Sequence, residues 1–350
     1  MSLVSQELQQ ILRQGAELLE PGPAWPQSQV QALQQAGVLR WTIPRRCGGQ
    51  ELSDAELLQG YLKLSRHCLC TAFLLTQHNA AVHRIAGGGS SPWRDTLLRG
   101  ITERGLWCTV GISHFSTSRQ HLQNPPVRAL PSSGGGWTLT GTVPWVTGAA
   151  AADWLITGGV LPDHQQILLA IPRETPGLEI EAPLPLMALN ATCTGRIHLH
   201  DVAVESEWLV AGPAEQVMKV GTQGGTGSLT TSALALGAAQ RTLERFAAEA
   251  AARESLREVV AALTDEATAI ETDLLSSARS SEPGRAEELR FRANSLVTRV
   301  SQAYLAACKG AGYVQGHPAE RAVREAMFFQ VWSCPQAVLN NTLNELSCRE

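Results

Sequence analysis

The sequence lacks several features that mark common classes of protein. No stretch of eighteen apolar residues occurs in its 350 residues, so no transmembrane helix is expected. No long run of like charges occurs, and the formal net charge of −4 offers no basic surface for nucleic acid. The first residues show no basic segment followed by an apolar one. We therefore expect a soluble, cytoplasmic protein that binds neither membrane nor nucleic acid.

Motifs of several enzyme classes are also missing. The eight cysteines are scattered, and the close pair Cys68 and Cys70 has the spacing of neither a zinc knuckle nor a redox Cys-x-x-Cys motif. His198 and His200 are expected on one strand face, but no third metal ligand lies near them in the sequence. No Gly-x-Ser-x-Gly motif occurs. These absences argue against disulfide bonds, a metal site and a serine hydrolase.

What the sequence does contain is a change of pattern along the chain. Up to about residue 104, apolar residues recur at helical spacing, and Ser53 with Glu56 predicts a capping box where one helix begins. Between residues 105 and 212, short β-type runs alternate with Gly, Pro, Ser and Asn, and no segment between them is long enough for a crossover helix. From residue 213, apolar stripes predict four helices, one of which begins at Pro318.

The predicted fold class is therefore α+β with three domains. Residues 1–104 form an N-terminal helical domain, residues 105–212 a central antiparallel β sandwich or barrel, and residues 213–350 a C-terminal four-helix bundle. Within the β domain, the segment from Gly135 to Gly148 predicts a hairpin in which Trp145 precedes Thr147 by two residues. An indole gives a stiff apolar face and a hydroxyl can bind a polar edge, so this segment suits a flat aromatic ligand.

Five segments, in the same order, resemble motifs of acyl-CoA dehydrogenase-type flavoproteins. They are residues 25–49, with a P-x-x-x-G-G turn, residues 136–147, similar to G-y-x-l-n-G-x-K-x-W-I-T, residues 187–204, residues 310–313, similar to G-G-x-G-Y, and residues 317–326, similar to Y-P-V-E-R-L-x-R-D-A. The resemblance covers nearly the whole chain and implies that FAD lies between the β domain and the bundle. It also implies that Trp145 packs against the isoalloxazine, that Thr147 binds near its N5 and O4 edge, and that Thr109 is a further flavin contact.

The chain departs from the family around the flavin phosphates. Bulkier residues from Thr109 to Ser116 replace T-E-P-G-A-G-S-D, and no R-x-x-F-G loop, whose Arg would reach the FAD of a neighbouring subunit, occurs between Arg245 and Leu263. The resemblance therefore implies FAD, with reduced FMN or FAD supplied by a reductase as the alternative. It also implies a homodimer or homotetramer.

The catalytic base of the family is missing as well. Alignment of Arg324 to Ala326 with the family's R-D-A sequence puts Ser333 at the usual glutamate position, and the position that a few members use instead is Gly227. A serine hydroxyl is a weak base at neutral pH, and losing a positioned base costs roughly a hundred- to ten-thousand-fold in rate.

Three functions remain open on this basis. The first is a flavin-dependent oxidoreductase with altered chemistry, such as an oxygenase acting on a small molecule. The second is a dehydrogenase of CH–CH groups in an acyl thioester, with Glu325 or a histidine of the segment 114–121 as replacement base. The third is a catalytically inactive family member that acts as a binding or assembly module.

Overall fold

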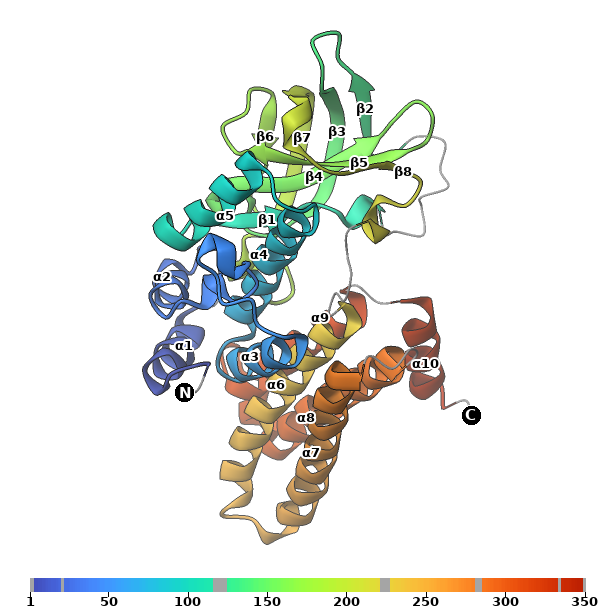
Figure 1. Ribbon diagram of the computed structural model, residues 1–350. Helices are drawn as coiled ribbons and strands as arrows, with labels where there is room; N and C mark the ends of the chain where they lie inside the picture. Colours follow the sequence, from blue (N-terminus) through green and yellow to red (C-terminus); the bar gives the residue numbers. More distant parts are fainter. Residues whose placement is uncertain are drawn as a thin grey trace.

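The computed structural model describes residues 3–19, 22–115, 125–220, 227–280, 285–332 and 335–348. A first group of helices and a C-terminal bundle form two helical regions, and a β region lies at one end of both (Figure 1). This order of helical, β and helical regions confirms the predicted fold class. The predicted boundaries, after residues 104 and 212, stay predictions; they fall in the loop after α5 and within β8.

The N-terminal region contains five helices: α1 (Gln6–Leu18), α2 (Gln27–Gln35), α3 (Asp54–His67), α4 (Leu69–Gly87) and α5 (Pro92–Arg104). Ser53 caps α3 in the predicted capping box, since its side chain accepts from the Glu56 amide and the Glu56 carboxylate accepts from the Ser53 amide. Helix α4 is apolar on most sides because it packs against β1 and against α6 of the bundle. It is therefore the central support for the β region.

The β region is one eight-stranded sheet. Its strands are β1 (Cys108–Val110), β2 (Val127–Pro131), β3 (Trp137–Val146), β4 (Trp154–Val160), β5 (Gln166–Pro172), β6 (Leu178–Ile180), β7 (Gly195–Val204) and β8 (Leu209–Ala214). Their order is β6-β7-β3-β2-β4-β5-β8, and β1 pairs with β4. Ile197 and Leu199 are buried and alternate with more exposed neighbours on β7, as the sequence pattern predicts.

The sheet differs from the prediction in being mixed rather than purely antiparallel. Strand β1 runs parallel to β4, and β2 touches β4 in parallel at one position, whereas the remaining pairs are antiparallel. The prediction required a helix for any parallel crossover. Here the connection from β1 to β4 contains β2 and β3, so a pair of strands takes the place of the helix.

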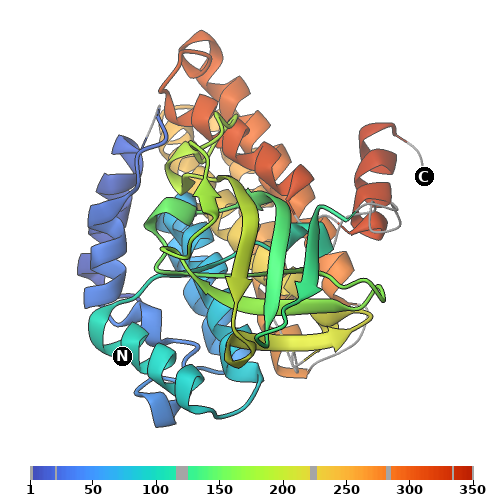
Figure 2. The same cartoon turned by 90° about the horizontal axis from the view of Figure 1, so that it is seen from above.

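The C-terminal region contains α6 (Gly227–Ala250), α7 (Arg257–Ser280), α8 (Arg285–Gly312), α9 (Pro318–Val331) and α10 (Gln336–Leu346). Helix α9 begins at Pro318, where a missing amide proton costs nothing. The first four helices form the predicted bundle, whereas α10 is an addition that contacts α8 and stands at the edge of the molecule (Figure 2). No helix in the described parts of the chain is long and apolar enough to cross a membrane.

One buried arginine joins the N-terminal helices to the sheet. Arg94 on α5 is only 6% exposed, and its guanidinium donates to the carbonyls of Ile85 on α4, at 2.6 Å, and of Leu209 and Val210 on β8, at 2.8 and 2.9 Å. These charge-assisted bonds satisfy carbonyls from two regions with one side chain. The position of the β region over α4 is thus fixed by polar as well as apolar contacts.

Candidate functional site

The end of strand β3 presents an exposed indole between buried residues. Trp145 is 53% exposed, whereas Val146 is buried and Thr147 is 6% exposed. Gly148 follows in the left-handed region, with φ of +66°, and a Cβ there would lie 2.7 Å from the ring of Trp25. The chain after Trp145 is therefore pressed against the N-terminal region, while the indole itself faces outward with a free apolar surface.

The backbone of Thr147 is held by Thr109 on β1. The Thr109 side chain is fully buried, and its hydroxyl donates to the Thr147 carbonyl at 2.7 Å. In the structure this hydroxyl thus serves to position the segment after β3. The expectation that Thr109 contacts a cofactor stays a prediction.

Three buried threonine hydroxyls form a chain that ends at Thr147. The Thr147 and Thr194 hydroxyl oxygens are 3.0 Å apart, and those of Thr194 and Thr192 are 2.9 Å apart. Each hydroxyl has one proton, so if Thr192 donates to Thr194 and Thr194 donates to Thr147, the Thr147 proton is left to point at an acceptor elsewhere. This arrangement can present one hydrogen-bond donor beside the exposed face of Trp145.

His114 lies in the short helix η3 (Ser113–Phe115) after β1. Its imidazole is 5% exposed, and Nε2 lies 3.1 Å from the carbonyl oxygen of Gly158 on β4. Burial lowers the pKa of His114 to about 4, so the ring is neutral at pH 7. His121, the other histidine of the segment 114–121, lies outside the described residues.

A cluster of three aromatic rings joins α4 to the end of α9. The Phe73 ring centroid lies 4.9 Å from that of Phe328 and 4.7 Å from that of Trp332, and the Phe328 and Trp332 rings are stacked at 5.0 Å. Sequence reasoning missed this cluster because its members are some 255 positions apart (328 − 73). Helix α4 also contacts η5 (Asn190–Thr192), so the cluster and the threonine chain border the same helix.

Two pockets of the described structure lie away from Trp145 and the threonine chain. One is lined by residues of α2, α5 and the chain between α2 and α3, and the other by residues of α1, α3 and α6. Among the described residues, no group of three His, Cys, Asp or Glu side chains is placed to hold a metal ion. The candidate site is therefore defined by Trp145 and the threonine chain.

Comparison with known sequences finds distant relatives, while no family model matches the chain. Dibenzothiophene monooxygenase from Mycolicibacterium goodii is 26% identical over 202 residues, which are 56% of this chain and 48% of the relative. Human mitochondrial short-chain specific acyl-CoA dehydrogenase is 23% identical over 329 residues, which are 88% of this chain and 79% of the relative. The matched part thus spans about half of the first relative and about four-fifths of the second.

Solved structures of similar proteins superpose on nearly the whole chain. FMN-bound TdsC from a Paenibacillus species superposes with a TM-score of 0.84 at 17% identity and covers 99% of this chain and 98% of its own. Butyryl-CoA dehydrogenase from Megasphaera elsdenii gives a TM-score of 0.81 at 17% identity, with the same coverage. The chain shares the fold of these enzymes and is distantly similar to them in sequence. The resemblance seen in the sequence is thereby confirmed.

The two positions that align with the catalytic glutamates of the resembling family carry no carboxylate in this chain. Gly227 is the first residue of α6, and Ser333 lies outside the described residues. Their identities as glycine and serine are a property of the sequence, and their assignment as base positions stays a prediction.

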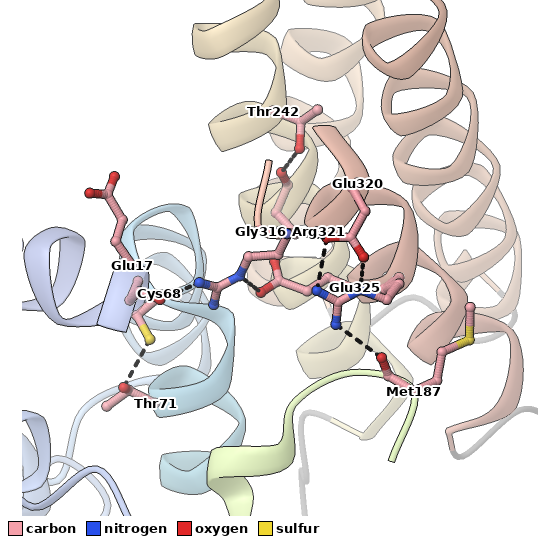
Figure 3. Close-up of polar contacts among 12 residues, drawn as sticks. Glu17, Cys68, Thr71, Met187, Thr242, Gly316, Glu320, Arg321 and Glu325 are labelled. Carbon is pink, nitrogen blue, oxygen red and sulfur yellow. Dashed lines mark hydrogen bonds and ion pairs between the residues drawn. The ribbon is translucent and has the colours of Figure 1, made fainter. Parts of the chain in front are cut away.

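Glu325, the acid considered as a replacement base, is held in a buried ion pair on α9. Its carboxylate accepts from Nε of Arg321 at 2.7 Å (Figure 3). Arg321 also donates to the carbonyl of Ala16 on α1. Burial by itself raises the pKa of Glu325, but the charges of Arg321, Arg241 and Arg245 outweigh it, so the pKa lies below its ordinary value. A carboxylate stabilised in this way is a weak proton acceptor, and a role for Glu325 as replacement base stays a prediction.

Proposed function

We propose that this protein is a flavin-dependent oxidoreductase whose chemistry is of the oxygenase type and whose substrate is a small organic molecule. The observation that carries the proposal is the lack of a suitable catalytic base. Gly227 and Ser333 have no carboxylate, and the carboxylate of Glu325 is paired with Arg321. Dehydrogenation of an acyl thioester needs a base for the α-proton, whereas oxygen transfer from a reduced flavin does not. The similarity to dibenzothiophene monooxygenase supports the same assignment.

The residues at the end of β3 fit a flavin. The Trp145 indole offers an exposed apolar face for the isoalloxazine, and the hydroxyl chain can direct the Thr147 proton toward a polar ring edge. The acyl-CoA dehydrogenase superfamily uses FAD, which is therefore the expected cofactor. Because the phosphate-binding motif is weakened, the alternative is reduced FMN or FAD supplied by a reductase. A similar solved structure binds FMN.

When bound, a reduced flavin supplies two electrons to dioxygen, so that one oxygen atom enters the substrate and the other leaves as water. The protein's own residues position the flavin and shield it from solvent. Trp145 supports the ring, Thr147 holds its polar edge, and Thr109 fixes the backbone of Thr147. The aromatic cluster joins Phe73 on α4 to Phe328 and Trp332 at the end of α9, and it would give a substrate apolar surface.

Flavin titration tests the cofactor part of the proposal. FMN and FAD, oxidised and reduced, are added to the full chain under anaerobic conditions while tryptophan fluorescence is recorded. Trp145→Ala is expected to weaken binding by about tenfold or more, because it removes the stacking face. The matched control is Leu130→Ala, which removes another exposed apolar side chain of the sheet, at 54% exposure. Equal effects of both changes, or no flavin binding at all, contradict the proposal.

Anaerobic mixing with acyl thioesters separates the two chemistries. The flavin-loaded protein is expected to keep its oxidised spectrum with short- and medium-chain acyl-CoA, since no base removes the α-proton. A second arm adds NADH, a flavin reductase and dioxygen and measures oxygen uptake with candidate aromatic substrates. Bleaching of the flavin by an acyl-CoA would show a dehydrogenase instead.

The assembly and location of the protein belong to the same proposal. We infer a homodimer or homotetramer in the cytoplasm, as in the resemblance to the superfamily. Exposed apolar side chains near the C-terminal helices support self-association, with exposed fractions of 78% for Val331, 53% for Leu343 and 68% for Leu346. Light scattering coupled to gel filtration gives the mass, and Leu346→Glu is expected to shift it toward the monomer.

A further inference from the structure

A second pocket lies where α1, α3 and α6 meet. Its volume is about 280 Å³, and its lining consists of polar and charged side chains: Gln9, Arg13, Lys63, Arg66, His67 and Glu244. None of these residues belongs to the site at the end of β3. The pocket is smaller than the range of about 300–1,000 Å³ that holds drug-sized molecules, so any ligand must be compact.

The lining carries more positive than negative charge. Arg13, Lys63 and Arg66 are cationic, and Glu244 is the one carboxylate in the lining. Arg66 pairs with Glu244, and Arg13 lies 3.8 Å from the same carboxylate. No ion-pair partner of Lys63 occurs within 4.0 Å among the described side chains. One carboxylate cannot balance three cations, so the pocket attracts an anion.

His67 adds no charge, but its ring positions the side chain of Arg13 in the pocket lining. Its Nδ1 lies 3.4 Å from a terminal nitrogen of Arg13, so the neutral ring can accept from the guanidinium. Burial, and then the charge of Arg13, lower the pKa of His67 to about 4, and Arg66 and Arg241 act in the same direction. The imidazole therefore stays neutral at pH 7 in the middle of three arginines.

Arg241 is the most telling residue of this region. It lies on α6 three positions before Glu244, on the same helical face, and is 7% exposed. Neither terminal nitrogen of its guanidinium has a hydrogen-bond partner in the part of the chain that the structure describes. Its charge acts on both His67 and Glu325, so it lies within electrostatic reach of the pocket and of the Arg321–Glu325 pair.

A buried guanidinium without partners is costly, because its charge has lost water and gained no acceptor. An anion beside His67 would contact Arg13 and Lys63 directly and would add a second negative charge near Arg241, which already faces Glu325. Guanidinium groups match the geometry of phosphate oxygens, which they bind in pairs. The arrangement thus has the charge, the size and the donor type for a compact phosphate.

We propose that the pocket between α1, α3 and α6 binds a small phosphate-bearing anion, with Arg13 and Lys63 as its donors and the buried charge of Arg241 behind the lining. The volume favours a ligand of the size of pyrophosphate or a small phosphorylated metabolite over a complete coenzyme. This site is independent of the flavin chemistry proposed above. Either proposal can fail without the other.

Titration of the full chain with inorganic pyrophosphate, followed by calorimetry at constant ionic strength, tests the proposal. One saturable site per chain is expected. Orthophosphate is the second probe and sulfate the third, and these arms distinguish a diphosphate site from a general oxyanion site. At a hundredfold excess over Kd, the ligand is expected to raise the Tm by about 3–5 °C.

Arg13→Gln and Lys63→Gln are each expected to weaken pyrophosphate binding at least tenfold, and both are changes in the lining that spare the packed interior. Arg241→Gln removes a charge behind the lining and is expected to weaken binding less than either lining change; if that variant does not fold, the two lining variants carry the test. The matched control is Arg128→Gln, an exposed arginine on β2. Binding that is absent, that is not saturable, or that falls equally in the Arg128 control overturns the proposal.

Discussion

Two buried polar regions of this molecule use opposite chemistry. At the end of β3, three neutral hydroxyls satisfy one another in a chain from Thr192 to Thr147. At the junction of α1, α6 and α9, full charges are buried, and Arg321 neutralises Glu325 while Arg241 has no hydrogen-bond partner in the described structure. The candidate flavin site thus rests on groups that do not change charge.

The difference separates stability from function. Charges that are paired inside a protein stabilise it only as long as both partners remain, whereas an exposed indole contributes little to folding and much to binding. Glu325 is the example of a residue that serves stability, and Trp145 is the example of a residue that serves binding. Variants of the two regions should therefore change different observables.

The largest effect on stability is expected from Glu325→Ala. Removing the carboxylate breaks the buried ion pair with Arg321, which costs about 3–5 kcal/mol of the free energy of unfolding. Urea denaturation measures it. The matched control is Glu249→Ala, whose pair with Arg253 is exposed and is worth about 0.2–1 kcal/mol. A variant that keeps its stability and loses only turnover would instead make Glu325 the catalytic base.

The second-largest effect is expected at acid pH, where the buried histidines should lower the free energy of unfolding. The pKa of His114 in the folded chain is about 4, below its ordinary value of 6.5, so the unfolded state binds more protons between these values. Stability is therefore full above about pH 6.5 and falls toward pH 4, by about 1.4 kcal/mol per pH unit for each such group. His114→Gln is expected to flatten this slope by up to that amount. The matched control is His164→Asn, at an exposed turn.

A smaller effect is expected from Thr194→Val, which interrupts the hydroxyl chain. The loss of its two hydrogen bonds should reduce the free energy of unfolding by about 1–2 kcal/mol. Without a donor behind it, Thr147 no longer keeps its proton for the ligand, and flavin affinity should fall about two- to tenfold. Thr194→Ser keeps the hydroxyl and should restore both values. An unchanged flavin titration in the valine variant argues against the chain as a positioning device.

The sequence allowed local features to be predicted well. The capping box of Ser53 and Glu56 and the start of α9 at Pro318 depend on residues within one turn, and both appear as expected. The exposure of Trp145 also agrees with the segment's interpretation as an aromatic seat. Its role in flavin binding remains a prediction.

Features that depend on distant partners escaped prediction. The parallel pairing of β1 with β4 follows from a connection through two strands, which local patterns do not reveal. Arg321 meets Ala16 across 305 positions, and Thr147 meets Thr194 across 47. The burial of His114 depends on its contact with Gly158 on β4, 44 positions along the chain. Each of these contacts exists only after the chain has folded.

The smallest effect on stability is expected where the effect on binding is greatest. Trp145→Ala removes a side chain that is 53% exposed, and the free energy of unfolding should change by less than about 0.5 kcal/mol. Urea denaturation of the flavin-free variant measures this, and the buried Trp41→Ala, at 1% exposure, should by contrast lose about 3–5 kcal/mol. A large loss of stability in Trp145→Ala would mean that the indole packs within the protein, and its free face would then no longer support a flavin seat.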